Sequence, residues 1–208
     1  RRYIEKYIRY KKNQFFLILI YMNGRKIDAI YENPLDNILI DLADKLTPLL
    51  YNNKITPNMV TTLSLILGII SGIYLYKDKY KLAALFTLFA YFFDCVDGHL
   101  ARKYDMVTIF GDYYDHFSDI FKFTLLLIIF YIKNKKKFYK IIIPITIMFL
   151  LMIIHFGCQE LMYEIGDAPT LSLTKPFCPK GSYIAITKFF GCGTFISLFI
   201  YLIYNYNK

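Results

Sequence analysis

The sequence lacks the patterns that would assign a small, basic, cysteine-containing chain to two common classes. Neither CxxC nor Cys/His spacing occurs among its four cysteines, which are Cys95, Cys158, Cys178 and Cys192. We therefore expect neither a zinc site nor a disulfide framework, and interpret all four as lone thiols in apolar helices. The net charge is +9, yet the basic residues cluster at the amino end and between apolar runs rather than on a face interleaved with aromatics. We therefore expect no nucleic-acid partner.

The amino-terminal region also lacks a convincing signal peptide. Its apolar run, FFLILIYM at positions 15–22, is shorter than the ~20 residues that a bilayer span needs. Residues 1–33 are otherwise basic and mixed in composition, and we treat them as a separate amino-terminal segment.

Apolar residues are in excess. They make up 56% of the 208 residues, above the roughly 45–50% of soluble domains, which favours a membrane protein. Long apolar segments predict an all-α polytopic membrane helix bundle, and they are 57–76, 82–93, 120–132, 141–158 and 184–204. This gives five crossings. A sixth arises only if the polar stretch 159–181, interpreted as a loop or a short re-entrant piece, contributes.

An amphipathic segment precedes the first span. In NPLDNILIDLADKLTPLL, leucine and isoleucine recur at a 3.6-residue period, which predicts a helix lying on the membrane surface over residues 34–53. Thr56 and Pro57 then have the positions of a helix cap and a first helical residue. They open the transmembrane domain, which we expect to occupy residues 54–208.

A stripe of small residues lies within the first span. Ser64, Gly68 and Gly72 repeat every four residues, so they lie on one face of a helix. Such a stripe lets another helix approach closely, and it serves either packing inside the bundle or a homodimer.

Aspartates interrupt the apolar pattern after the second span. Asp94 and Asp97 are three positions apart on one helix, and Asp115 and Asp119 are four apart on the next, so each pair projects from one face; Asp112 is off this spacing. The apolar segments 82–93 and 120–132, which lie before and after the aspartates, have similar lengths. If the two helices are antiparallel, both pairs of aspartates lie at one depth, about two-thirds of the way through the ~30 Å hydrocarbon. One aspartate there costs ~2.5–3.5 kcal/mol, so four like charges need cations. An all-oxygen ligand set predicts Mg²⁺ or Mn²⁺.

Other residues near the aspartates suit a phosphorylated ligand. Gly98 and Gly111 bracket the connection, where missing side chains allow a ligand to approach the backbone. Arg102 supplies a fixed positive charge and bidentate donors for phosphate. Together these features indicate phosphoryl transfer. A cation or proton transporter would also explain the carboxylates, but not the glycines, Arg102 or the ordered spacing.

The complete pattern is Asp94-x2-Asp97-Gly98-x2-Ala101-Arg102-x8-Gly111-x3-Asp115-x3-Asp119. It closely resembles the signature of the CDP-alcohol phosphotransferases, with every fixed position present and the spacing unbroken. The resemblance covers about residues 33–208. It implies an integral-membrane enzyme of phospholipid biosynthesis that transfers a phosphoalcohol group from a CDP-alcohol to a second alcohol and releases CMP. It also implies a two-metal site that faces the cytosol.

The resemblance further implies roles for individual residues. Asp94, Asp97 and Asp115 would hold the metal ions, and Asp119 would be both a metal ligand and the general base for the attacking hydroxyl. The nucleotide and its phosphates would be bound by Asn58, Thr61, Gly98, Ala101, Arg102 and Gly111.

The substrates stay open from the sequence. The motif DHxxD slightly favours CDP-choline or CDP-ethanolamine with diacylglycerol, whereas the short chain and DGHLAR resemble enzymes that join CDP-diacylglycerol to inositol. Polar residues after the motif are candidates for acceptor selection, and we expect Gln159, Glu160 and Lys188 to contribute. Lys122, one turn beyond Asp119, either pairs with a carboxylate or snorkels towards the interface, and snorkelling is the commoner of the two.

Overall fold

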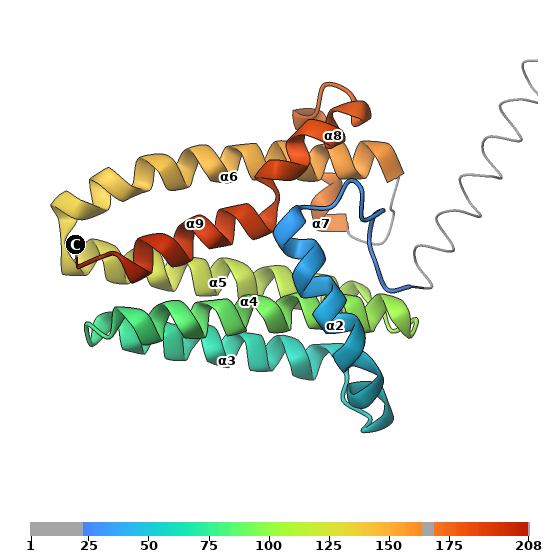
Figure 1. Ribbon diagram of the computed structural model, residues 1–208, viewed down its shortest axis with the longest axis horizontal. Coiled ribbons are helices and arrows are strands. Elements are labelled where there is room, and N and C mark those ends of the chain that lie inside the picture. Colours follow the sequence, from blue (N-terminus) through green and yellow to red (C-terminus); the bar gives the residue numbers. More distant parts are fainter. Residues whose placement is uncertain (1–22, 164–168, 208) are drawn as a thin grey trace, which may run out of the picture.

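The computed structural model describes residues 23–163 and 169–207, and all regular secondary structure in these ranges is helical (Figure 1). The long helices are α2 (Pro34–Asn52), α3 (Pro57–Tyr76), α4 (Tyr80–Lys103), α5 (Ile109–Lys133), α6 (Lys135–Tyr163) and α9 (Cys192–Tyr204). Shorter pieces lie between the last two, and they are α7 (Pro169–Ser172), η1 (Lys175–Phe177), η2 (Gly181–Tyr183), α8 (Ile184–Thr187) and η3 (Lys188–Phe190). The predicted all-α bundle is confirmed.

Hydroxyl side chains start the helices that carry the site. Thr56 accepts a hydrogen bond from the Met59 amide, and Pro57 occupies the first turn of α3, as predicted. Thr108 caps α5 in the same way, because its hydroxyl accepts from the Gly111 amide at 3.0 Å. These caps fix where α3 and α5 begin, beside the end of α4.

Helix α6 begins earlier than the predicted segment 141–158. Asn134 accepts a hydrogen bond from the Lys137 amide at 3.0 Å, so the lysine-rich stretch forms the first turns of the helix. Pro144 lies inside α6. Apolar periodicity could not locate this start, because the cap and the lysines are polar.

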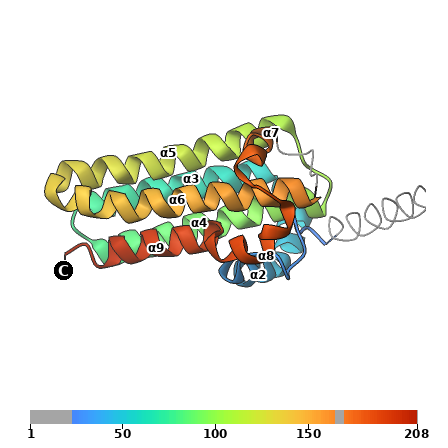
Figure 2. The ribbon, with the colours of Figure 1, turned by 90° about the horizontal axis from the view of Figure 1, so that it is seen from above.

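Four described segments are long and apolar enough to cross a membrane, and they are Pro57–Tyr76, Tyr80–Lys103, Lys135–Met162 and Gly181–Tyr204. Helix α5 has 25 residues, which suffices by length, but its first half carries the charged residues of the motif. It runs beside α3 and packs against α6 (Figure 1, Figure 2). In the described part of 159–181, only the end of α6 and short helical pieces occur.

The small-residue stripe of α3 is used inside the bundle. The Ser64 hydroxyl donates to the Ala90 carbonyl of α4 at 2.8 Å. A Cβ added at Gly68 would lie 2.5 Å from Cγ of Lys122 on α5. The stripe therefore lets α4 and α5 approach α3 closely, which is the first of its two expected uses.

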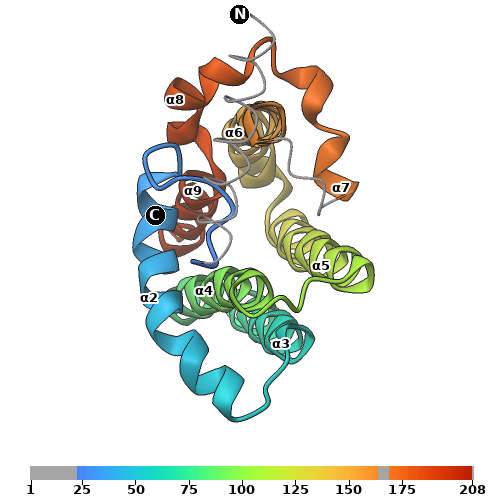
Figure 3. The same ribbon diagram turned by 90° about the vertical axis from the view of Figure 1, so that its right-hand side faces the viewer.

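Helix α2 runs across the bundle near one end, against α4 and α9 (Figure 3). Its buried residues are Asp36, Ile40, Ala43 and Thr47. Four of its large apolar side chains are instead 41–60% exposed, and they are Leu35, Ile38, Leu42 and Leu49. An apolar face turned outward suits a helix that lies in the membrane surface.

One covalent link contradicts the interpretation of the cysteines as lone thiols. Cys158 of α6 and Cys178 form a disulfide, with their Cα atoms 5.1 Å apart, whereas Cys95 and Cys192 are free. The chain folds back along α6 after residue 169, and Gly157 leaves room for the backbone of the returning segment. Cysteine spacing could not predict this pair, because a tertiary contact rather than a local motif brings it together.

Candidate active site

A cavity of about 410 Å³ lies at the end of the bundle that α2 crosses. It is lined by all four motif aspartates and by all six residues expected at the nucleotide, which are Asp94, Asp97, Asp115, Asp119, Asn58, Thr61, Gly98, Ala101, Arg102 and Gly111. The aspartates come from the consecutive helices α4 and α5, and Asn58 and Thr61 come from the first turns of α3. Local helix geometry thus brings the ten residues to one cavity.

Three of the carboxylates form a compact group. One oxygen from each of Asp94, Asp115 and Asp119 lies within 4.8 Å of the other two. The Oδ1 atom of Asp115 is buried and has no hydrogen-bond partner among the described residues, so a cation that binds oxygen would satisfy it. Carboxylate oxygens at this spacing fit a hard divalent cation.

The fourth carboxylate has a protein partner instead. Asp97 is 3% exposed and accepts a hydrogen bond of 2.6 Å from the Thr61 hydroxyl. It lines the same cavity one turn beyond Asp94. Thr61 therefore orients a carboxylate of the motif, in addition to the nucleotide contact expected of it.

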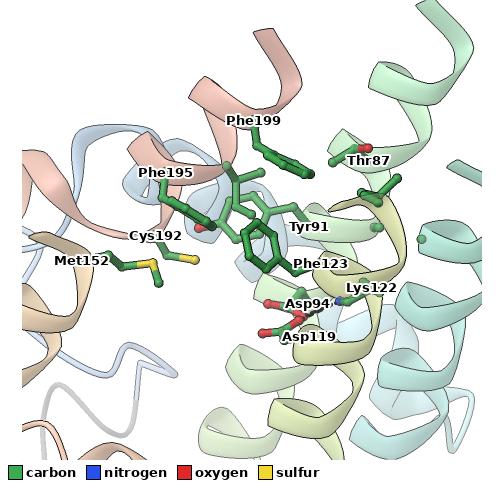
Figure 4. A pocket seen from close by; sticks show the side chains of 14 residues that line it. Thr87, Tyr91, Asp94, Asp119, Lys122, Phe123, Met152, Cys192, Phe195 and Phe199 are labelled. Carbon is green, nitrogen blue, oxygen red and sulfur yellow. Dashed lines mark hydrogen bonds and ion pairs between the residues drawn. The ribbon is translucent and has the colours of Figure 1, made fainter. Parts of the chain in front are cut away.

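Lys122 lies within the carboxylate group, so it pairs with carboxylates and does not snorkel, although snorkelling is the commoner of the two expected outcomes. Its ammonium pairs with Asp94 at 3.0 Å and with Asp119 at 2.8 Å, and donates to the Ser64 hydroxyl at 2.7 Å (Figure 4). Its side chain packs on Gly68. Lys122 thus adds one fixed positive charge between two aspartates that would otherwise repel. Its position three residues after Asp119 is the signal that could have found it.

Motif glycines make room for polar side chains elsewhere in the cavity lining. A Cβ added at Gly98 would lie 3.1 Å from Nη1 of Arg102, and one at Gly111 would lie 3.3 Å from Oδ1 of Asn58. The Nε atom of Arg102 donates to the Gly24 carbonyl at 2.9 Å, which ties the guanidinium to the segment before α2. A guanidinium and an amide over exposed backbone suit a nucleoside phosphate.

The three residues expected at the acceptor lie in different surroundings. Gln159 lines the cavity, and its amide nitrogen lies 2.9 Å from a ring nitrogen of a neighbouring histidine. Glu160 is fully buried and pairs with Lys26 at 3.1 Å. Lys188 lies outside the cavity lining, and its ammonium donates to the Ile30 carbonyl at 2.8 Å. Of the three, only Gln159 borders the cavity directly.

The segment before α2 and the first turn of that helix contribute further charges. Lys26, Glu32 and Asp36 all line the cavity. Burial lowers the pKa of Lys26, although the Glu160 carboxylate opposes this. Burial, reinforced by the Asp36 carboxylate, raises the pKa of Glu32 to about 7. Burial also raises the pKa of Asp36, which accepts hydrogen bonds from the Tyr91 hydroxyl and from a backbone amide of α9.

Comparison with known proteins decides the family. Residues 54–202 match the family model described as CDP-alcohol phosphatidyltransferase. The chain belongs to this family. It is accordingly a membrane transferase of phospholipid biosynthesis, and the matched range contains every residue of the motif. Members of the family generally depend on divalent metal, which agrees with the carboxylate group and its unpartnered oxygen.

Two relatives match parts of this CDP-alcohol phosphatidyltransferase. A "Cardiolipin synthase (CMP-forming) / mitochondrial hydrolase fusion protein" of Schizosaccharomyces pombe is 41% identical over 73 residues, which are 35% of this chain and 12% of the relative. An uncharacterized protein of Aquifex aeolicus is 33% identical over 106 residues, which are 49% of this chain and 50% of the relative. The matches thus span half or less of each relative's length. No solved structure matches the chain significantly.

Two polar residues of α5, Asp112 and His116, line the site but do not belong to the family motif. Thr170 of α7 donates from its hydroxyl to the Asp112 carboxylate at 3.0 Å, and His116 lies beside both. Asp112 and His116 line the cavity of the phosphatidyltransferase. His116 belongs to the DHxxD sequence, but no local spacing connects Asp112 with Thr170.

Proposed function

We propose that this CDP-alcohol phosphatidyltransferase transfers a phosphoalcohol group from a CDP-alcohol to the hydroxyl of a second alcohol and releases CMP, at a site that binds two Mg²⁺ or Mn²⁺ ions. The observation that carries the proposal is one cavity bordered both by three clustered carboxylates and by the Gly98–Arg102 pair. That combination suits a diphosphate between metal ions and a guanidinium.

We assign different roles to the carboxylates according to their exposure. Asp94, Asp97, Asp115 and Asp119 would hold the ions, whose chemistry when bound is to neutralise charge on the diphosphate. The Asp119 side chain is 45% exposed, whereas that of Asp94 is 15% exposed. The more accessible Asp119 is the candidate general base, which takes the proton from the attacking hydroxyl as the new oxygen–phosphorus bond forms.

The nucleotide would bind along α3, α4 and the start of α5. Residues proposed for this role are Asn58, Thr61, Gly98, Ala101, Arg102 and Gly111. The glycines leave the backbone accessible, and Arg102 offers charge-assisted hydrogen bonds to phosphate. Its bond to the Gly24 carbonyl fixes the direction of the guanidinium.

The acceptor side is proposed to depend on Gln159, Glu160 and Lys188. Gln159 would contact the acceptor, since it borders the cavity. Glu160 would act by holding Lys26 at the cavity wall, and Lys188 by fixing the Ile30 carbonyl in the segment before α2. Replacement by alanine should raise the acceptor KM most for Gln159, less for Glu160 and least for Lys188. The donor KM should stay unchanged in all three variants.

We also propose that the site faces the cytosol. Arg25, Lys26, Arg102 and Lys103 lie at the site end of the bundle, which agrees with the tendency of basic residues to remain cytosolic. The lysines near the start of α6 lie at the other end and oppose this assignment. Labelling of single cysteines introduced at Lys103 and Lys136 by an impermeant maleimide in intact cells distinguishes the two orientations.

A transporter is the alternative, and the packing beyond the carboxylates disfavours it. A path for a cation would need polar groups through the bundle to the other face. In the described residues, the core beyond the site is apolar and aromatic, with Leu126, Ile129, Phe130, Phe199 and Ile203. The cavity thus fits a reaction site better than a channel.

The test is CMP release by purified protein in detergent. Donors are CDP-choline, CDP-ethanolamine and CDP-diacylglycerol, each supplied with lipid and water-soluble alcohols and with Mg²⁺ or Mn²⁺. We expect release for at least one pair, loss of release in EDTA and recovery when metal is restored. Cation flux in liposomes without CMP release from any pair would overturn the proposal in favour of the transporter.

A further inference from the structure

We propose that the acceptor is a lipid alcohol whose alkyl chain lies in an apolar recess behind the carboxylates. This inference rests on the proposed function and names the class of its second substrate. The recess is a cavity of about 120 Å³ lined by residues of α3, α4, α5, α6 and α9. Its inner wall is apolar and aromatic, and Phe123, Phe195 and Phe199 form it (Figure 4) together with Leu126 and Ile196.

The recess has a polar end that belongs to the active site. Asp94 and Asp119 line both the recess and the larger cavity, and so do Tyr91, Met152 and Cys192. Lys122 lines the recess from the same side (Figure 4). Apart from Thr87, whose hydroxyl is hydrogen-bonded to Ser71 at 2.8 Å, the polar groups of the recess lie at or near the carboxylates, and its apolar wall belongs to the aromatic core. A molecule with one reactive polar end and an apolar chain has the complementary shape.

The position of the recess favours the acceptor over the donor. None of the six residues proposed for the nucleotide lines it. In phosphoryl transfer the attacking and leaving oxygens lie roughly in line through phosphorus. CMP leaves on the side of Arg102, which does not line the recess, so the attacking hydroxyl approaches from the side of Asp119, which does.

The reaction on this arrangement balances without a further reactant. The hydroxyl oxygen of the lipid alcohol forms a bond to the β-phosphorus of the CDP-alcohol. The bond between that phosphorus and the oxygen of CMP breaks, and CMP leaves with the electron pair. The hydroxyl proton passes to the Asp119 carboxylate. Diacylglycerol and phosphatidylglycerol share the required chemistry, a free hydroxyl on an alkyl-bearing lipid.

The first test fills the recess without touching the carboxylates. Ile196→Trp adds bulk at the recess wall, and Ile200→Trp is its matched control, because Ile200 is a partly buried core residue of the same helix outside the recess. Acceptor KM is measured for dioleoylglycerol and dioleoylphosphatidylglycerol, and for inositol, serine and glycerol 3-phosphate. We expect a lipid alcohol to be the acceptor and Ile196→Trp to raise its KM about tenfold or more, because methylenes lose their apolar surroundings. Ile200→Trp should change it less than twofold.

The second test does not require turnover. Cys192 lines the recess and the larger cavity, whereas Cys95 lines only the latter, so residue-resolved labelling by N-ethylmaleimide compares the two thiols. We expect micelles containing dioleoylglycerol or dioleoylphosphatidylglycerol to slow labelling of Cys192 more than that of Cys95, and Ile196→Trp to remove the difference.

The outcomes separate the two proposals. Absence of CMP release from every pair overturns the proposed function, while slower Cys192 labelling would still support lipid in the recess. CMP release only with water-soluble alcohols overturns the inference and keeps the proposed function. The inference is also overturned if the lipid KM is unchanged in a folded Ile196→Trp protein. It is overturned likewise if neither lipid changes the rate of Cys192 labelling.

Discussion

The two walls of the cavity are built in different ways. One wall comes from α3, α4 and α5, which follow one another in the chain, and it carries the complete motif. The other joins the segment before α2 to α6 and α9 through distant contacts, such as the Asn33 side chain donating to the Lys188 carbonyl at 2.7 Å and to Thr194 at 2.8 Å. Local helix spacing thus supplies the reaction chemistry, and tertiary contacts supply the surroundings in which an acceptor is chosen.

The largest effect is expected at the wall formed by α3, α4 and α5, which carries the motif. Asp119→Asn should reduce turnover about 10²–10⁴-fold, since it removes the candidate base. Binding of CDP with Mn²⁺ should remain, because the other carboxylates are unchanged. CMP release gives turnover, and isothermal titration calorimetry gives CDP affinity.

Asp94→Asn is the comparison variant for this prediction. Asp94 belongs to the compact carboxylate group and is less exposed than Asp119, so its loss should weaken metal and CDP binding together. Near-normal turnover in Asp119→Asn would remove the base assignment. Equal losses of CDP affinity in both variants would remove the distinction between their roles.

Lys122→Met is expected to have the next largest effect. Asp94 and Asp119 would lose the ammonium that pairs with both, so turnover should fall about 10–100-fold, as for other groups that orient metal ligands. The Mn²⁺ concentration that half-saturates thermal stabilisation should decrease, because the carboxylates would carry more unbalanced negative charge. Thermal unfolding at graded Mn²⁺ measures this shift without turnover.

Lys133→Met provides a matched control on the same helix. Lys133 pairs with Asp78 at 2.6 Å, far along α5 from the cavity, so its loss should leave both turnover and the Mn²⁺ midpoint unchanged. If Lys122→Met behaves like this control, the ion pairs of Lys122 serve packing alone.

The contrast between the walls also explains what the sequence could predict. The all-α bundle and the convergence of Asp94 with Asp115 and Asp119 followed from helical periods and two consecutive apolar arms. The buried position of Lys122 was missed because snorkelling was preferred over a pairing that the same spacing allows. The Cys158–Cys178 disulfide and the Lys26–Glu160 pair could not be predicted, because folding of distant segments alone brings them together.

A smaller effect is expected from the disulfide of the second wall, which joins the segment before α2 to α6 and α9. Replacing Cys158 and Cys178 together by alanine should lower the free energy of unfolding by about 2–4 kcal/mol, because the cross-link restricts the unfolded chain. CDP affinity should stay within twofold, since neither cysteine lines the cavity. Thermal unfolding with and without reductant measures the change, and reductant should no longer affect the double variant. A double variant as stable as the oxidised parent would mean that packing alone holds this wall.

The smallest effect concerns pH and Glu32, on the same wall. Burial and the Asp36 carboxylate raise the Glu32 pKa from 4.5 to about 7, so the folded protein binds this proton more tightly than the unfolded chain. The resulting stability is full below about pH 4.5 and is lost as pH rises through 7. Glu32→Gln should therefore raise the unfolding midpoint by a few degrees at pH 8 and leave it unchanged near pH 4.5.

Asp44→Asn is a control of opposite sign. A hydrogen bond from Lys103 lowers the Asp44 pKa, so this change should slightly lower the unfolding midpoint at pH 8. Equal midpoints for Glu32→Gln and its parent at both pH values would show that Glu32 is not held as a neutral group.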